Sequence, residues 1–192
     1  MEALKVEEIL PLDEYERRRA DMRARMQRVR QLRRLELGDS CVVIFENRET
    51  VRFQVQEMLR VDQTDTPERI ALELSCFNLL VPKFHELSAT LILRIKEYRD
   101  VDDTLKRMSG LTKNCIAVHV GEERIPARFD VEDESLLCTG DMFYIHFAFS
   151  EEQIAAFRDP AVPVTLRACH PHCSADIPIV GETRDSLLQD LC

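Results

Sequence analysis

The spacing of hydrophobic positions changes along the chain, from a helical period in the first third to alternation in the remainder. Residues 13–35 read as one long helix, in which Asp13 is expected to cap the first turn together with Glu16 three residues later. Its apolar stripe consists of Tyr15, Met22, Met26 and Val29. Because this stripe is thin, the pattern predicts a helix that lies on a folded body or against another subunit.

Three further segments complete the N-terminal part. Residues 41–45 (CVVIF) predict a short buried strand. Residues 49–61 fit both periods, because TVRFQV alternates while the whole run also keeps one apolar helical face. We favour a helix there, since the run is long and continues without a break. Thr66 and Pro67 are typical of the start of the next helix, as N-cap and first-turn residue.

Beyond residue 82 alternation dominates, which is typical of strands. The expected strands are 89–95, 115–120, 125–129, 142–149 (a central strand) and 162–168, with short helices at 101–108, 151–157 and 183–191. The fold class expected from this order is α+β, a mostly antiparallel sheet with a helical N-terminal third. The expected division is an Arg-rich helix arm over 1–37, an α+β domain over 38–173 and a loosely attached C-terminal tail over 174–192.

Charge is distributed unevenly. The net charge is −9, yet the segment from Arg17 to Arg34 holds nine arginines against one acid, Asp21, so that it carries +8 and the remainder −17. We expect this helix to dock on the acidic surface of the protein itself or on an acidic partner, which makes a non-enzymatic regulatory or interaction module one alternative function. Nucleic acid is the less favoured partner, because no aromatic residues alternate with the arginines.

Composition excludes several classes of protein. The first residues lack the basic and apolar regions of a signal peptide, and no stretch approaches the length of a membrane helix. The seven cysteines are scattered, which favours reduced thiols and a cytoplasmic location. The chain also lacks the GxGxxG, P-loop, GxSxG and HExxH motifs of familiar enzymes.

A metal site is the first candidate for chemistry. The segment CHPHC holds four metal-ligating side chains, Cys169, His170, His172 and Cys173, at the end of an expected strand. Five residues rarely wrap four ligands around one ion, so His146 on another strand is the expected distant partner. Imidazole and thiolate ligands would select zinc or iron. The alternative is a polar strand end whose histidines form hydrogen bonds or face solvent.

A polar cluster is the second candidate. Its members are Glu46, Arg48, Gln54, Glu57 and Arg60, with Glu73 from the next helix. Carboxylates flanked by arginines can hold a metal or an anion, and the alternative is an internal ion-pair network that joins helix and sheet.

The block VIFENRETVRFQVQEMLRV at 43–61 resembles the signature of a bacterial protein family of unknown function, and weaker matches extend over nearly the whole chain. The resemblance implies a cytoplasmic protein encoded near rubrerythrin-like and iron–sulfur proteins, hence a place in redox or peroxide metabolism with such a partner. Relatives tend to carry Asp before the His-Pro where this chain has Cys169, which leaves His146 and His170 as the better metal ligands. We therefore expect a homodimeric accessory or metal-binding protein, with a non-haem metal-dependent enzyme as another alternative.

Overall fold

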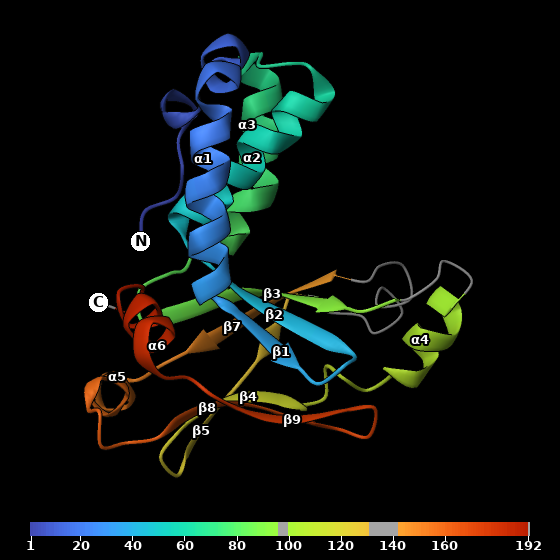
Figure 1. Cartoon of the computed structure of the whole chain (residues 1–192), viewed down its shortest axis with the longest axis vertical. Coiled ribbons are helices and arrows are strands. Elements are labelled where there is room, and N and C mark those ends of the chain that lie inside the picture. The colour runs from blue at the N-terminus through green and yellow to red at the C-terminus, as the bar shows by residue number, and fades with distance from the viewer. Residues whose placement is uncertain (96–99, 131–141, 192) are drawn as a thin grey trace.

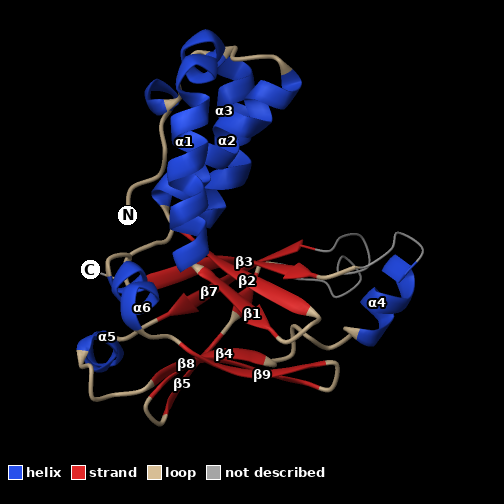
Figure 2. Cartoon of the chain, viewed as in Figure 1, coloured by secondary structure: helices blue, strands red, loops and turns tan. Residues whose placement is uncertain are grey.

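Helices and strands separate into two parts of the molecule. A computed structural model of the chain describes residues 1–95, 100–130 and 142–191. Helices α1, α2 and α3 stand together at one end, and two β-sheets with shorter helices form the rest (Figure 1). The same view coloured by secondary structure makes the division plain (Figure 2). The predicted α+β class with a helical N-terminal part is confirmed.

The helices of the helical part all lie within the first eighty residues, which also contribute two strands to one of the sheets. These helices are η1 (Val6–Glu8), α1 (Leu12–Leu32), α2 (Arg48–Asp62), α3 (Pro67–Phe77) and η2 (Asn78–Leu80). Helix α2 confirms the helical interpretation of the ambiguous segment, and Asn47 fixes its start because its side chain accepts hydrogen bonds from the N–H groups of Glu49 and Thr50. Thr66 caps α3 as predicted, since its hydroxyl accepts from the N–H of Arg69.

The strands of the described part form two antiparallel sheets, with orders β1-β2-β3-β7-β6 and β5-β4-β8-β9. The strands are β1 (Arg34–Leu37), β2 (Cys41–Glu46), β3 (Glu86–Leu93), β4 (Ile116–Val120), β5 (Glu123–Pro126), β6 (Arg128–Phe129), β7 (Met142–Ala148), β8 (Val164–His170) and β9 (Cys173–Pro178). The short helices are α4 (Val101–Arg107), α5 (Glu151–Arg158) and α6 (Gly181–Leu188). The predicted strand 142–149 is β7, although β3 holds the centre of its sheet.

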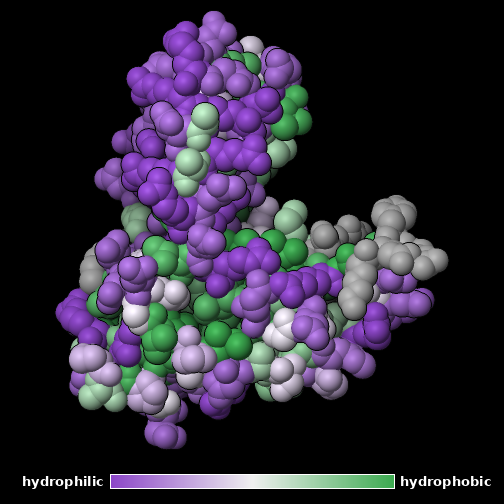
Figure 3. All heavy atoms as spheres, in the orientation of Figure 1, coloured by the Kyte–Doolittle hydropathy of each residue, from purple (hydrophilic) through white to green (hydrophobic). Residues whose placement is uncertain are grey.

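The larger hydrophobic core joins the two sheets. Phe45 and Phe147 of the five-stranded sheet pack with ring centroids 6.0 Å apart, and they share a core cluster with Val118 and Leu166 of the other sheet. A second core holds α2 and α3 together through Val51, Val55, Leu59, Ile70 and Leu74. On the visible face, hydrophilic residues cover the helices, whereas hydrophobic residues gather over the sheets (Figure 3).

Two expectations about local structure are wrong. Asp13 does not cap α1: the helix begins at Leu12, whose N–H donates to Oδ2 of Asp65, 2.8 Å away, on the link between α2 and α3. The segment 125–129 is not one hairpin strand, because β5 ends at Pro126 and β6 joins the other sheet. Both differences arise from tertiary contacts that no local pattern encodes.

The expectation that the C-terminal tail is loosely attached is also wrong. Residues 173–178 form β9, which pairs with β8 in the register His170↔Cys173 to Thr165↔Pro178. Leu187 and Leu191 are buried in the larger core. The expected arm over 1–37 likewise ends in a strand, β1, rather than in helix alone.

Among the described residues, no helix is both long and apolar enough to cross a membrane. Helix α1 meets the length, but its arginines leave it strongly polar.

Candidate functional site

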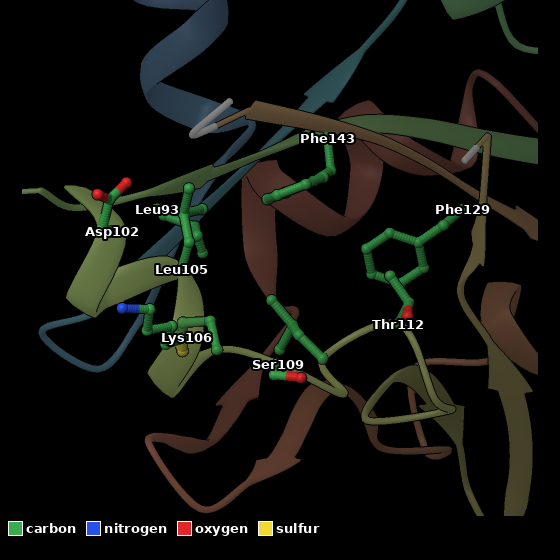
Figure 4. Close-up of a pocket in the computed structure, with 10 residues that line it drawn as sticks. Leu93, Asp102, Leu105, Lys106, Ser109, Thr112, Phe129 and Phe143 are labelled. Carbon is green, nitrogen blue, oxygen red and sulfur yellow. The ribbon is translucent and has the colours of Figure 1, made fainter. Parts of the chain in front are cut away.

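An apolar pocket of about 350 Å³ lies between α4, the turn after it, and the ends of three strands of the five-stranded sheet (Figure 4). Its apolar walls come from Leu93, Leu105, Met108, Leu111, Phe129 and Phe143, and its polar residues are Asp102, Lys106, Ser109 and Thr112. The rings of Phe129 and Phe143 meet edge to face with centroids 6.4 Å apart. This volume and this mixture of many apolar and few polar groups are typical of small-molecule sites.

The turn that forms one wall of the pocket is held by His170. The Nε2 atom of His170 lies 3.0 Å from the carbonyl oxygen of Ser109, and its Nδ1 accepts a hydrogen bond from the N–H of His172. Because Nδ1 is an acceptor, Nε2 carries the proton and donates it to Ser109. Both ring nitrogens of this buried histidine therefore have partners, and its geometry is that of a structural link.

The CHPHC segment is the turn of the hairpin between β8 and β9. Alternation along the strands sends His170 and Cys173 inward, where they are buried, and leaves Cys169 and His172 exposed. The Sγ atom of Cys173 donates to the carbonyl oxygen of Leu37 in β1. The four side chains are thus divided between two faces of the hairpin.

His146 lies elsewhere, in the middle of a ring of charged groups. Its Nδ1 is 3.1 Å from Glu86 Oε1 on β3, and its Nε2 is 3.0 Å from Asp130 Oδ2 after β6. Arg128 approaches both carboxylates, each at 3.5 Å. The structure therefore does not unite His146 with His170: each has both ring nitrogens committed to partners of its own.

Burial alone would lower the pKa of His146, but the hydrogen bonds to Glu86 and Asp130 raise it above its ordinary value. In this ring, the positive charges of Arg128 and, when it is protonated, of the imidazole balance the negative charges of the two carboxylates. Next to it a shallow hollow of about 450 Å³ is lined by Leu79, Lys83, Arg128, Phe129, Asp130 and His146. This arrangement can hold a proton tightly beside solvent.

A metal ion finds few ligands in the described part of the chain. Among those residues, no group of three or more His, Cys, Asp or Glu side chains is arranged to hold one. At His146 the two carboxylates lie against different ring nitrogens, so that only Asp130 could share an ion with Nε2.

The predicted polar cluster is divided into separate pairs. Glu57 binds Arg19 and Tyr15 of α1, Arg60 pairs with Glu16, Arg48 pairs with Glu8, and Glu73 pairs with Arg69. Gln54 lines a surface hollow beside α1. Since α2 turns by about 100° per residue, its polar positions face different neighbours.

Glu46 is the most deeply buried member of that set, with 3% of its surface exposed. Its two oxygens accept hydrogen bonds from the hydroxyls of Thr50 and Thr90. Ser88 lies opposite Glu46 on the neighbouring strand β3, and its buried hydroxyl has no hydrogen-bond partner among the described residues. The group joins α2 to the sheet.

Sequence reasoning missed the pocket and the charged ring. Glu86, Arg128 and Asp130 carry no motif, and they reach His146 only because the register pairs β7 with β3 and β6. The alternation of residues 142–149 predicted a strand, but not which residues would contact His146.

These features define a small α+β protein with two antiparallel sheets, in which α4, the turn after it and the five-stranded sheet line an apolar pocket. The chain belongs to the family described as protein of unknown function (DUF3501), whose model matches residues 3–191. A crystal structure of a novel protein of unknown function from Burkholderia pseudomallei K96243 has a TM-score of 0.91, 24% sequence identity and full coverage of both chains. That likeness shows the fold. The comparison with curated proteins gave no match.

Proposed function

We propose that the protein is an accessory protein of bacterial redox metabolism that binds a small apolar molecule. The apolar pocket carries this proposal. Its volume of about 350 Å³ lies within the usual range of ligand sites. Several residues of its walls also belong to the larger hydrophobic core, which holds them in place. The link to redox metabolism comes from the family resemblance of the 43–61 block. A binding role fits a pocket whose walls are mostly apolar side chains.

The lining of the pocket favours a ligand with one apolar body and one polar end. Phe129 and Phe143 offer ring faces and edges that suit an aromatic or aliphatic body. Ser109, Thr112 and the Lys106 ammonium are the donors at the polar side. A carboxylate or sulfonate head group would match these donors.

Fluorescence titration with 1-anilinonaphthalene-8-sulfonate, followed by competition with decanoate, tests the proposal. Ser109→Trp should place a large ring at the pocket and weaken binding of both probes at least ten-fold. Asp103→Trp is the matched control, because Asp103 is exposed on α4, a few residues before Ser109, and does not line the pocket. Equal binding by the two variants, with both folded by circular dichroism, would refute the proposed site.

A divalent transition metal at His146 is a second candidate, favoured by the 3.0 Å approach of Nε2 to Asp130 beside an open hollow. Waters would have to supply the remaining ligands. Elemental analysis after incubation with zinc or ferrous iron should then find about one ion per chain. His146→Ala should lose that ion and His172→Ala should keep it; the reverse result would exclude this candidate.

Three expectations about the cell remain predictions. They are homo-oligomerisation, a rubrerythrin-like or iron–sulfur redox partner, and a cytoplasmic location. Light scattering tests the first, co-purification with the encoded neighbours tests the second, and cell fractionation tests the third. The Arg-rich helix as a docking module stays a further alternative, since Arg17, Arg23 and Arg28 are exposed.

A further inference from the structure

Two cysteines face each other across neighbouring strands of the four-stranded sheet. Strands β4 and β8 pair antiparallel with Ile116 opposite Ala168. One step further in the same register places Cys115 opposite Cys169, and the N–H of Cys169 donates to the carbonyl oxygen of Cys115 at 2.8 Å. Side chains of directly opposed residues project from the same face of a sheet.

This geometry is within reach of a disulfide. Opposed residues that share a backbone hydrogen bond have Cα atoms about 5.5 Å apart, inside the range of about 4.4–6.8 Å that disulfides span. The Sγ atom of Cys169 already lies 3.3 Å from the carbonyl oxygen of Cys115. The Sγ atom of Cys115 lies 3.4 Å from the carbonyl oxygen of Gly110. Both residues are free thiols in this structure, so a side-chain rotation would bring the sulfurs together.

The two thiols also differ in a way that suits stepwise exchange. Cys169 is exposed and Cys115 is half-buried, so a reagent in solution meets Cys169 first. Burial and the neighbouring Cys169 raise the pKa of the Cys115 thiol, which favours its protonated form before the second exchange step. A second pair of neighbouring cysteines, Cys41 and Cys173, is buried and shielded from solvent. Cys173 also projects to the opposite face of the hairpin from Cys169.

We propose that Cys115 and Cys169 form a reversible cross-strand disulfide, a dithiol redox site that exchanges with low-molecular-weight disulfides. The Cys169 thiolate attacks a disulfide such as oxidised glutathione, which breaks its S–S bond and releases one glutathione thiolate. The Cys115 thiol then loses its proton and attacks the Cys169 sulfur of the mixed disulfide. The second glutathione leaves, so one glutathione disulfide is reduced to two thiols while two protein thiols become one disulfide.

Peptide mapping of the full chain equilibrated in glutathione redox buffers, then alkylated, tests the proposal. Trypsin should yield residues 114–124 linked to residues 168–184 in the oxidised protein, and dithiothreitol should separate them. The second peptide holds both Cys169 and Cys173. Cys173→Ser should therefore retain the linked pair, whereas Cys169→Ser should reduce its yield at least ten-fold.

Circular dichroism of the reduced Cys169→Ser variant checks that it folds like the parent, which is expected because its side chain is exposed. A linked pair that persists in Cys169→Ser would show that another cysteine is the partner and would overturn the assignment. The absence of the linked pair from the parent protein, across buffers that oxidise ordinary vicinal dithiols, would overturn it equally.

Discussion

Buried charges in this protein are held by more than one partner each. His146 is 2% exposed and sits between the carboxylates of Glu86 and Asp130, with Arg128 completing the ring. Removing one member of such a buried group leaves the remaining charges without a partner, which commonly lowers the free energy of unfolding by several kcal/mol. The ring therefore ties β3, β6 and β7 together by electrostatics where the sheet approaches solvent.

The raised pKa of His146 makes this contribution depend on pH. A histidine whose folded pKa exceeds its unfolded pKa stabilises the protein fully below the unfolded pKa, and the effect is lost as pH rises through the folded pKa. His146→Ala should thus lower the free energy of unfolding by roughly 2–4 kcal/mol near pH 6, with a smaller loss near pH 9. Urea denaturation with a chelator present measures both values.

His172→Ala is the matched control for that experiment, because His172 is exposed on the hairpin turn. It should change stability by less than about 0.5 kcal/mol at either pH. A loss in His146→Ala that is the same at pH 6 and pH 9 would show that the imidazole is neutral in the folded protein.

At this scale the sequence indicates neither the burial of His146 nor its partners. His146 alternates with Phe143, Ile145 and Phe147, so the pattern places it on the face opposite those apolar side chains. Its burial depends on Glu86 and Asp130, which strand register brings to it. The sequence does not contain that register, so it could not exclude the predicted pairing of His146 with His170.

Between elements, helix α1 is fixed to α2 chiefly through one acid. Glu57 accepts two hydrogen bonds from Arg19 and one from Tyr15, both on α1. The hydrogen-bonded Arg19 guanidinium lowers the pKa of Glu57 to about 2. Tyr15 is fully buried and packs with Met26 and Phe53 in a small cluster of their own. The thin apolar stripe of α1 is therefore sufficient because ion pairs supplement it.

Glu57→Gln should lower the free energy of unfolding by about 1–3 kcal/mol at pH 7, since it removes a bidentate, partly buried ion pair. A carboxyl with a depressed pKa stabilises above its unfolded pKa, so the effect should fade as pH falls from about 4.5 towards 2. Thermal or urea denaturation of the variant from pH 2 to pH 7 gives the test.

Glu49→Gln is the matched control on the same helix. Glu49 pairs with Arg25 of α1, but that arginine side chain is 71% exposed. Loss of this ion pair should therefore lower the free energy of unfolding by less than about 1 kcal/mol. If Glu49→Gln proved as damaging as Glu57→Gln, the account of a single dominant link between α1 and α2 would be wrong.

Elements with a complete local pattern could be predicted, and those that depend on a neighbour could not. Helix α2 keeps one apolar face over its length and has a capping Asn47, so length decided the ambiguous TVRFQV run correctly. Strand β9 was missed although its positions alternate in burial, because it is short, lies at a sheet edge and fully buries only Cys173. Its existence follows from pairing with β8, which only the folded hairpin supplies.

For the whole molecule, one buried arginine joins the helical part, the sheet and the C-terminal helix. Arg33 follows α1 and is 1% exposed. It donates to the carbonyl oxygens of Phe45 and Glu46 in β2, to Ser186 on α6 and to the Asp190 carboxylate. Arg33 therefore connects the first third of the chain directly with the last third.

Asp190→Ala should lower the free energy of unfolding by about 3–5 kcal/mol, because it leaves the Arg33 charge buried without its anion. Asp185→Ala, an exposed position on α6, should change it by less than about 0.5 kcal/mol. Denaturant titration compares them. A double variant with Arg33→Met and Asp190→Leu should recover part of the loss, and a double variant as unstable as Asp190→Ala would contradict the uncompensated-charge explanation.

The central claim is that the pocket beneath α4 binds a small apolar molecule, and methyl-resolved NMR tests it most directly. Spectra of protein labelled at Leu and Met methyl groups would be recorded while 1-anilinonaphthalene-8-sulfonate is added. The account predicts saturable shifts confined to Leu93, Leu105, Met108 and Leu111, which line the pocket. Shifts at exposed leucines of the helical part, Leu72 and Leu79, without change at the pocket methyl groups, would contradict it.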